Sequence, residues 1–102
     1  MPFSVQVIYP VSEGSTFDFD YYLDTHMSLV EEHMGPHIEQ TIVSQGYAAG
    51  PETPPAYHAV ATMLFPDRDA MHKALKAAGP VNKDIRNFTN VRPDILLGKV
   101  IA

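Results

Sequence analysis

The chain has 102 residues, enough for one domain rather than two, and 45% of them are hydrophobic and 19% charged. This balance favours a folded chain with a real core over a disordered one. The chain has no cysteine, which excludes thiol nucleophiles, disulfides, thiolate zinc sites and iron–sulfur clusters. Its net charge of −5 argues against nucleic acid as a partner, because phosphate binding needs a basic surface.

No stretch of the sequence addresses the chain to a membrane or to export. Residues 1–15 lack a basic start followed by a long apolar run. The longest apolar runs are strand-sized, far short of the roughly 20 residues of a membrane-spanning helix. We therefore expect a cytoplasmic protein with no membrane partner.

The first predicted element is a strand over residues 3–9, which has alternating apolar residues and ends at Pro10. Apolar residues at helical spacing then predict a helix over residues 18–34. We expect Asp18 to be its N-cap and Gly35-Pro36 to stop it.

One motif inside this helix leaves two interpretations open. Ser28 and Glu31 have the spacing of a capping box, in which a serine side chain starts a helix. The helix would then break near Ser28 and restart. The alternative is a helix that runs through this position.

The rest of the chain predicts three more strands and one more helix with an extra turn. In chain order these elements cover residues 38–45, 57–65, 66–78, 81–87 and 94–101. Residues 46–56 are rich in Gly and Pro, and their length suggests a lid, a rim or an interface. The order β-α-β-β-α-β predicts an α+β, ferredoxin-like fold over residues 1–102, with both helices on one face of a four-stranded antiparallel sheet.

Charge is distributed unevenly along the chain. Residues 1–67 hold nine acids and no lysine or arginine, whereas residues 68–102 hold all seven basic residues and three acids. The two parts are either two solvated faces or surfaces that lie side by side, within a subunit or across a dimer. We expect the acidic first helix to attract the second helix, which carries Arg68, Lys73 and Lys76.

Both faces of the predicted strands are apolar, although a sheet face left in water should be polar. The simplest remedy is a second copy of the chain packed sheet against sheet. We therefore predict a homodimer that encloses a semi-apolar cavity between the two sheets. Ser4, Gln6, His58 and Thr62 suit the wall of such a cavity better than a dry core.

His26 is the candidate catalytic residue. It lies in the apolar stripe of the first helix, one turn after Tyr22. Histidine has an ordinary pKa near 6.5, so beside a cavity His26 could serve as a general base at neutral pH. The alternative is a half-buried core histidine bonded to a backbone carbonyl.

The other histidines carry weaker signals. His33 and His37 have the spacing of a metal-binding pair, but Gly35-Pro36 lies between them and the sequence places no third ligand. We expect two exposed histidines there and no metal. His58 and His72 have no partner visible in the sequence and are expected to be solvated or in the core.

Aromatic and amide side chains are the remaining candidates for a binding site. The five tyrosines suit a pocket for a flat apolar molecule, although core and rim positions explain them as well. Asn87, Thr89 and Asn90 could bond a ligand oxygen or form turns. No dinucleotide fingerprint, phosphate loop or nucleophile elbow is present, so we expect no cofactor.

The run FDFDYYLDTHM at residues 17–27, preceded by Tyr9-Pro10, resembles the EthD family, which is named for ethyl tert-butyl ether degradation. Gly35-Pro36 and residues 44–46 and 87–90 extend the resemblance over nearly the whole chain. In such proteins position 28 is often Pro and here it is Ser. The resemblance implies a ferredoxin-like chain that pairs into a dimeric α+β barrel.

What the resemblance implies for function is less defined. The name-giving member acts in xenobiotic degradation beside a haem-thiolate monooxygenase system, in an undefined role. Relatives with the same barrel include cofactor-free oxygenases, cyclases or dehydratases, and lactone isomerases. Carried over by position, Tyr22 and His26 are pocket residues, and Tyr9, Thr89 and Asn90 are further substrate-binding candidates.

Two functions therefore stay open. In the first, a small hydrophobic molecule binds in the barrel cavity, His26 accepts its proton, and Tyr22 and Asn90 orient the oxygen that gains charge. The reaction would be a cofactor-independent oxygenation, dehydration or isomerisation in catabolism. In the second, the chain is a non-enzymatic accessory protein that sequesters a catabolite or docks on an oxygenase partner. A sealed pocket facing His26 favours the first.

Overall fold

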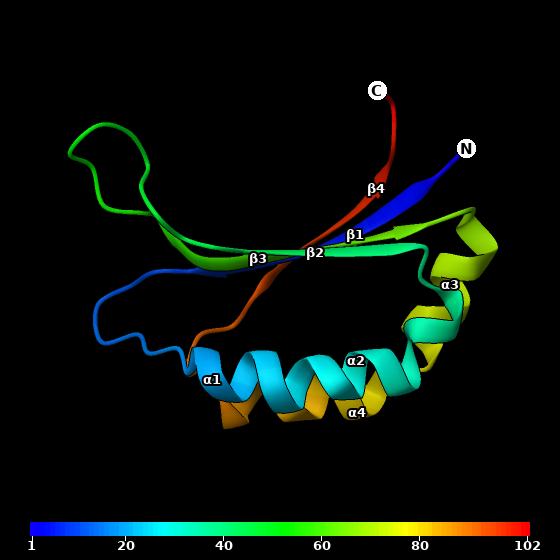
Figure 1. Ribbon diagram of the computed structural model, residues 1–102, viewed down its shortest axis with the longest axis horizontal. Coiled ribbons are helices and arrows are strands. Elements are labelled where there is room, and N and C mark those ends of the chain that lie inside the picture. Colours follow the sequence, from blue (N-terminus) through cyan, green and yellow to red (C-terminus); the bar gives the residue numbers. More distant parts are fainter.

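The computed structural model describes residues 1–102 as two layers, a four-stranded sheet above a helical layer (Figure 1). The strands are β1 (Phe3–Pro10), β2 (Gln40–Gln45), β3 (Tyr57–Phe65) and β4 (Asp94–Lys99). All neighbouring pairs are antiparallel, in the order β2-β3-β1-β4. This is the ferredoxin-like fold, as predicted.

The first helix is built from three pieces, which are α1 (Phe19–Tyr21), the π-helical turn η1 (Tyr22–His26) and α2 (Met27–His33). It begins as predicted, because the Asp18 side chain accepts a hydrogen bond from the Tyr21 N–H at 3.1 Å. The capping box does not form, since the Ser28 hydroxyl donates instead to the Asp24 carbonyl at 2.6 Å. The irregularity lies earlier, in η1.

The second half of the helical layer follows the predicted order with shifted ends. Its pieces are η2 (Gly35–His37), α3 (Arg68–Lys76), α4 (Gly79–Asp84) and η3 (Ile85–Asn87). Asp67 caps α3 by accepting a bond from the Ala70 N–H at 2.8 Å. Gly79-Pro80 lies between the predicted helix over residues 66–78 and the predicted turn over residues 81–87, and in the structure it starts α4, because proline fits the first turn of a helix.

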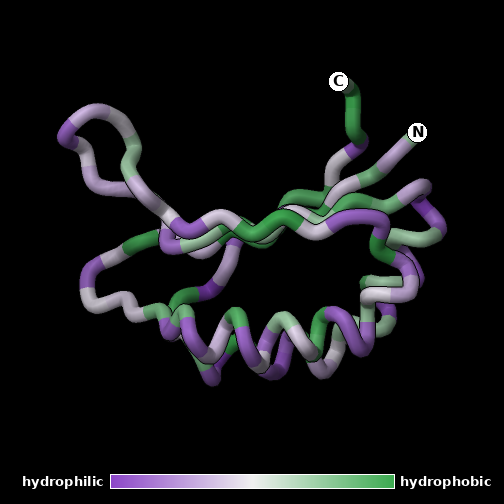
Figure 2. The backbone as a smooth tube through the Cα atoms, in the orientation of Figure 1, coloured by the Kyte–Doolittle hydropathy of each residue, from purple (hydrophilic) through white to green (hydrophobic).

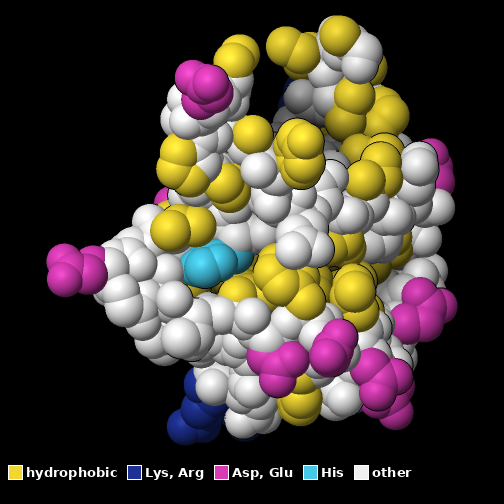
Figure 3. Space-filling view, turned by 60° about the vertical axis from the view of Figure 1, so that its left-hand side comes forward, with side chains coloured by type: hydrophobic (Ala, Val, Ile, Leu, Met, Phe, Trp, Pro, Cys, Tyr) yellow, Lys and Arg dark blue, Asp and Glu magenta, His cyan; other side chains and the backbone are white.

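The expected attraction between the acidic first helix and the basic helix that carries Arg68, Lys73 and Lys76 is wrong, because these two helices are not the ones that pack side by side. The helix that packs beside α2 is α4, whereas α3 lies at the end of the layer and contacts η2 (Figure 1). No ion pair joins Arg68, Lys73 or Lys76 to an acid; the two contacts of a basic side chain with an acid are made by histidines, His26 with Asp84 and His33 with Glu32. Figure 3 shows acidic side chains in a row along the helical layer, below apolar ones.

The core lies between the sheet and the helices and has two parts. We call the larger one the aliphatic cluster, because all its members except Phe65 are aliphatic; it consists of Val5, Val30, Met34, Met63, Phe65, Met71, Ala74, Ala78 and Val81. The smaller one, the aromatic cluster, consists of Tyr9, Tyr22, Ala59 and Phe88. Figure 2 shows the apolar segments that run along the strands and alternate with polar positions along the helices. No helix of the chain is long and apolar enough to cross a membrane.

The opposite face of the sheet carries no helix (Figure 1). On it the register aligns Gln6 with Thr62 and Leu96, and Thr62 with Ile42. Gln6 donates to the Thr62 hydroxyl at 3.2 Å, while Ile42 and Leu96 are 47% and 53% exposed. The uncovered face is therefore a mixture of apolar and hydrogen-bonded polar side chains, as the strand pattern predicted.

Candidate active site

A cavity of about 150 Å³ lies between the sheet and the helical layer. Hydrophobic residues form 14 of its 17 lining positions. A volume of this size holds a ligand of about one six-membered ring. Tyr9, Tyr22 and His26 line it together, so the structure brings three of the five predicted site residues to one place.

The cavity lies on the opposite side of the sheet from the predicted one. The sequence analysis placed it between two sheets, with His26 facing it and Ser4, Gln6 and Thr62 in its wall. Those three residues alternate along their strands with the core and belong to the uncovered face, whereas His26 comes from the helical layer. Because successive strand residues point to opposite faces, one cavity cannot be lined by both sets.

The π-helical turn η1 positions His26. The Met27 N–H bonds to the Tyr22 carbonyl five residues back, which widens the turn. The imidazole stacks on the Tyr22 ring with centroids 5.5 Å apart and planes 17° apart, and it contacts the Phe88 ring at 4.5 Å. His26 is only 3% exposed, so these rings and the cavity are its surroundings.

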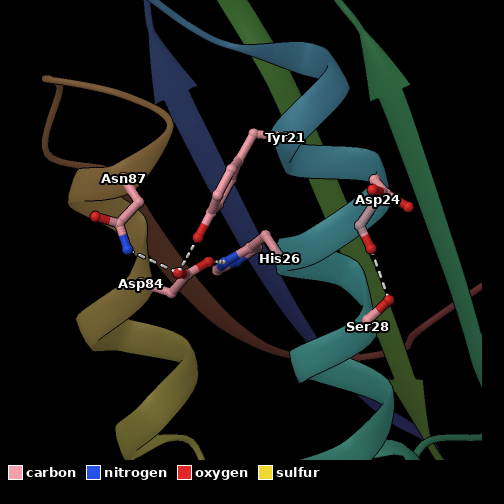
Figure 4. A network of polar contacts seen from close by, with 6 residues as sticks. All are labelled: Tyr21, Asp24, His26, Ser28, Asp84 and Asn87. Carbon is pink, nitrogen blue, oxygen red and sulfur yellow. Dashed lines mark hydrogen bonds and ion pairs between the residues drawn. The ribbon is translucent and has the colours of Figure 1, made fainter.

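Asp84 is the partner of His26, and the sequence analysis missed it. Its Oδ2 lies 2.9 Å from His26 Nδ1 (Figure 4). Its Oδ1 accepts hydrogen bonds from the Tyr21 hydroxyl at 2.6 Å and the Asn87 amide at 2.9 Å. The expected alternative, a bond from His26 to a backbone carbonyl, is therefore wrong. The sequence does not single it out, because Asp84 is one of three acids in residues 68–102.

The surroundings set the charges of this pair. Burial lowers the pKa of His26 and outweighs the opposing hydrogen bond and charge of Asp84. Burial would raise the pKa of Asp84, but hydrogen bonds from Tyr21, Asn87 and His26 hold it below its ordinary value. The pair is thus a neutral imidazole and a carboxylate at neutral pH. The proton sits on Nδ1, which donates to Asp84, and the lone pair is on Nε2.

Three polar atoms at this end of the cavity bond to no other group of the chain. They are Nε2 of His26 and the hydroxyls of Tyr9 and Tyr22. No buried side-chain nitrogen or oxygen lacks a partner, so each of these three atoms keeps some accessible surface. Because Tyr9, Tyr22 and His26 are otherwise buried and all line the cavity, the cavity is the space that these atoms face. Burial raises the pKa of Tyr22 to about 12 and also raises that of Tyr9. Both hydroxyls therefore stay protonated and can donate.

Thr89 and Asn90 lie outside the cavity. The Thr89 hydroxyl donates to the Thr16 carbonyl at 2.7 Å. The Asn90 side chain accepts from the Thr16 N–H at 2.8 Å and donates to the Gly14 carbonyl at 3.0 Å. These bonds hold the loop that follows β1 against the segment after η3. The substrate-binding role of both residues stays a prediction, without support from the cavity.

The remaining histidines lie away from this site. His58 Nε2 is 2.9 Å from the Ser15 hydroxyl, and its ring stacks on Phe17 with the centroids 5.6 Å apart, so the structure supplies partners that the sequence did not reveal. His33 lies 3.4 Å from a Glu32 oxygen, and His72 is exposed. No group of three or more His, Asp or Glu side chains could hold a metal ion.

The remaining tyrosines also differ from Tyr9 and Tyr22. Tyr21 is half-buried and bonds to Asp84, so it supports the site without lining the cavity. Tyr47 is 95% exposed on the loop over residues 46–56, and Tyr57 is 47% exposed. That loop projects away from the sheet, on the side opposite the helices (Figure 1).

Comparison with known proteins gives a family and a fold. The model of the EthD domain matches residues 14–92. An EthD-like protein from Ralstonia eutropha is 29% identical, with a TM-score of 0.88 over 99% of this chain and 93% of that one. No curated protein matches the sequence.

Two more distant solved structures share the fold alone. SnoaB, a cofactor-independent oxygenase from Streptomyces nogalater, is 13% identical, with a TM-score of 0.54 over 98% of this chain and 94% of that one. A dimeric ferredoxin-like protein of unknown function from Jannaschia is also 13% identical, with a TM-score of 0.57 over 97% of this chain and 98% of that one.

Proposed function

The chain belongs to the EthD family, and we propose that it binds a small hydrophobic organic molecule in the cavity between its sheet and helices. There His26 acts as the general base of a proton transfer that needs no cofactor. The observation that carries this proposal is the His26–Asp84 pair, which leaves Nε2 free at the wall of an apolar cavity. The cofactor-independent oxygenase SnoaB supports it by analogy of fold only.

In this proposal each group has its own role. Nε2 of His26 accepts a proton from a carbon or hydroxyl of the bound molecule. The Asp84 carboxylate then stabilises the imidazolium, as an acidic partner of a catalytic histidine does. The hydroxyls of Tyr9 and Tyr22 donate to the oxygen that gains charge, and the apolar walls strengthen these interactions. Tyr9 replaces Asn90 in the predicted pair of orienting residues.

A generic carbon acid tests the base without a known substrate. Benzisoxazole opens to a cyanophenolate when a base removes its ring proton, and its five-membered ring fused to a benzene ring is only slightly larger than the single ring that the cavity holds. We expect the protein to speed this reaction at pH 7 and His26→Gln to lose about 100-fold or more, the typical contribution of a general base. His33→Gln, which alters a histidine outside the cavity, is the matched control. Equal rates for wild type and His26→Gln contradict the proposal.

The proposal includes a homodimer formed through the uncovered sheet face and a cytoplasmic location. The exposed Ile42 and Leu96 support a dimer, because water-exposed apolar area favours association. The dimeric protein from Jannaschia shows that this fold pairs elsewhere. Pairing through this face would form an α+β barrel and leave the cavity of each subunit accessible from its own helical side.

The accessory function is the second candidate, and one observation favours it. Ile95 and Leu97 on the edge strand β4 share the helical side with Val7 and Val5, yet they are 56% and 50% exposed, Ile95 even though it also lines the cavity. A sheet-to-sheet dimer would leave them in water, so they suit a protein partner such as an oxygenase. A catalytically inert protein that still binds a small molecule would favour this role.

A further inference from the structure

We propose that the ligand of the cavity is an uncharged molecule of about one ring with a single oxygen at one end, a phenol or an enolisable ketone, and not a carboxylate. This inference rests on the proposed function, because it describes what the same cavity binds. Three features of the wall carry it: its division into a polar and an apolar part, its lack of fixed charge, and the match of its donors and acceptor to one oxygen.

The polar atoms of the wall are gathered where the cavity meets the aromatic cluster. Tyr22 stacks on His26 and meets Tyr9 edge to face, with ring centroids 6.0 Å apart. The opposite part of the wall belongs to the aliphatic cluster, including Met34 and Ala78. The other polar lining residues, Thr41 and Asn82, are exposed and therefore lie at the rim. A ligand with one polar end and one apolar end fits this division.

The wall carries no fixed charge. No Lys, Arg, Asp or Glu lines the cavity, and the nearest anion is Asp84, which lies behind His26. A buried carboxylate of the ligand would have no cation to pair with, which is costly. An ammonium group would not find a free carboxylate to pair with either, because no acid lines the cavity and Asp84 already accepts from Tyr21, His26 and Asn87. An uncharged ligand meets neither penalty.

The three polar atoms beside the aromatic cluster can all form hydrogen bonds with a single ligand oxygen. Nε2 of His26 accepts, while the Tyr9 and Tyr22 hydroxyls donate. A phenol would donate its O–H to Nε2 and accept from the tyrosines. When its proton passes to Nε2, the O–H bond breaks, an N–H bond forms, and the negative oxygen keeps both tyrosine donors. A ketone would lose a proton from the neighbouring carbon instead, and its carbonyl oxygen would become the enolate oxygen. Neither step needs an oxidant or a reductant.

Three one-ring probes test the inference: p-cresol, toluene and p-toluate, titrated into the protein and followed by NMR. They have similar shapes and differ in the polar group. We expect p-cresol to bind about tenfold more tightly than toluene, as the net value of one or two hydrogen bonds implies. We expect p-toluate to bind more weakly than toluene. The double variant Tyr9→Phe/Tyr22→Phe should remove most of the advantage of p-cresol and leave toluene unchanged.

The control is Tyr47→Phe, which removes the hydroxyl of a tyrosine that is 95% exposed and should change neither affinity. Toluene that binds as tightly as p-cresol, or p-toluate that binds best, overturns the inference while cavity binding stands. A p-cresol advantage that survives the double variant also overturns it. If neither p-cresol nor toluene binds, the proposed function fails, and the inference fails with it.

Discussion

The aliphatic and aromatic clusters occupy the same layer between sheet and helices but are built differently. The aliphatic cluster contains no hydrogen-bonding side chain. In the aromatic cluster Tyr9, Tyr22 and Phe88 meet edge to face or tilted, with centroids 5.0–6.0 Å apart. Behind them lies the hydrogen-bonded group around Asp84. Both clusters line the cavity, but only the aromatic one brings unpaired polar atoms to it.

This difference indicates that the aliphatic cluster mainly stabilises the fold, whereas the aromatic cluster provides the polar atoms for binding. Aliphatic side chains contribute to stability by burying apolar area. A polar atom without a protein partner contributes nothing to folding, and its retention in a buried place makes sense only if something else bonds to it. Substitutions at the two ends should therefore separate stability from binding.

The largest effect on stability is expected at Phe65. This side chain is fully buried in the aliphatic cluster, so Phe65→Ala should cost about 3–5 kcal/mol through lost burial and a cavity. The matched change in the aromatic cluster is Tyr22→Phe, which removes a hydroxyl without a protein partner and should cost less than about 0.5 kcal/mol. Urea unfolding measures both. Equal losses in the free energy of unfolding for the two variants would contradict this separation of stability from binding.

The next effect concerns the two sides of β4. Leu96 and Leu97 are adjacent and similarly exposed, at 53% and 50%, but the register places Leu96 on the uncovered face and Leu97 on the helical side. If the sheets pair, Leu96→Asp buries a charge without a partner and should turn the dimer into a monomer at micromolar concentration. Leu97→Asp should leave the dimer intact.

Analytical ultracentrifugation distinguishes the outcomes. A wild-type chain that is a stable monomer at micromolar concentration refutes the dimer. Loss of the dimer with Leu97→Asp but not with Leu96→Asp would place the interface on the helical side of the sheet and contradict pairing through the uncovered face. Circular dichroism of both variants verifies that the fold is retained.

The Asp84 network should show an intermediate effect. Asp84→Ala leaves three donors, on Tyr21, His26 and Asn87, without their acceptor and should cost about 1–3 kcal/mol. It should also change which ring nitrogen of His26 carries the proton. Nitrogen-15 NMR reads this directly: the proton should be on Nδ1 in wild type and shared between the nitrogens in the variant.

Tyr21→Phe is the control for this network, because it removes one donor from Asp84 and keeps the acceptor of His26. It should destabilise the protein less and leave the proton on Nδ1. If Asp84→Ala retains the wild-type nitrogen signals of His26, the pair does not fix the imidazole. Asp84 would then be a structural residue only.

Much of the fold was predictable because it depends on local patterns. Alternating residues gave β3 its observed bounds, and Asp18 caps the first helix as expected. The end of α3 was harder, because Gly79-Pro80 is at once a stop for one helix and a good start for the next. Ser28 followed the capping pattern by sequence, but its hydroxyl bonds back to Asp24 within a continuous helix.

The candidate site was predictable only where its residues share an element. Tyr22 and His26 lie one turn apart, so their joint position followed from helical spacing. Asp84 is 58 residues from His26, and no spacing rule connects them. The side of the sheet that holds the cavity was missed for a related reason. Alternation along a strand tells which residues share a face, but it does not tell which face the helices cover.

The smallest expected effect is a dependence of stability on pH that His26 confers. Burial lowers the pKa of His26 in the folded protein below its ordinary value of 6.5. Below about pH 6.5 the unfolded chain therefore takes up this proton more readily than the folded chain, and the free energy of unfolding falls until the pH reaches the folded pKa. Asp84 has a lowered pKa too, but its contribution is lost only below about pH 3.8, so the two windows are separate.

Urea unfolding of wild type and His26→Gln between pH 8 and pH 5 isolates this contribution. Glutamine does not titrate, and the other four histidines are common to both proteins, so they cancel in the difference. Wild type should lose its stability relative to the variant as the pH falls below about 6.5. The loss should be smaller than that of Asp84→Ala, because the bond to Asp84 opposes the effect of burial. A relative gain of wild type toward pH 5 would mean that Asp84 outweighs burial and that the pKa of His26 is raised in the folded protein, not lowered. The assignment of burial as the dominant influence on His26 would then be wrong.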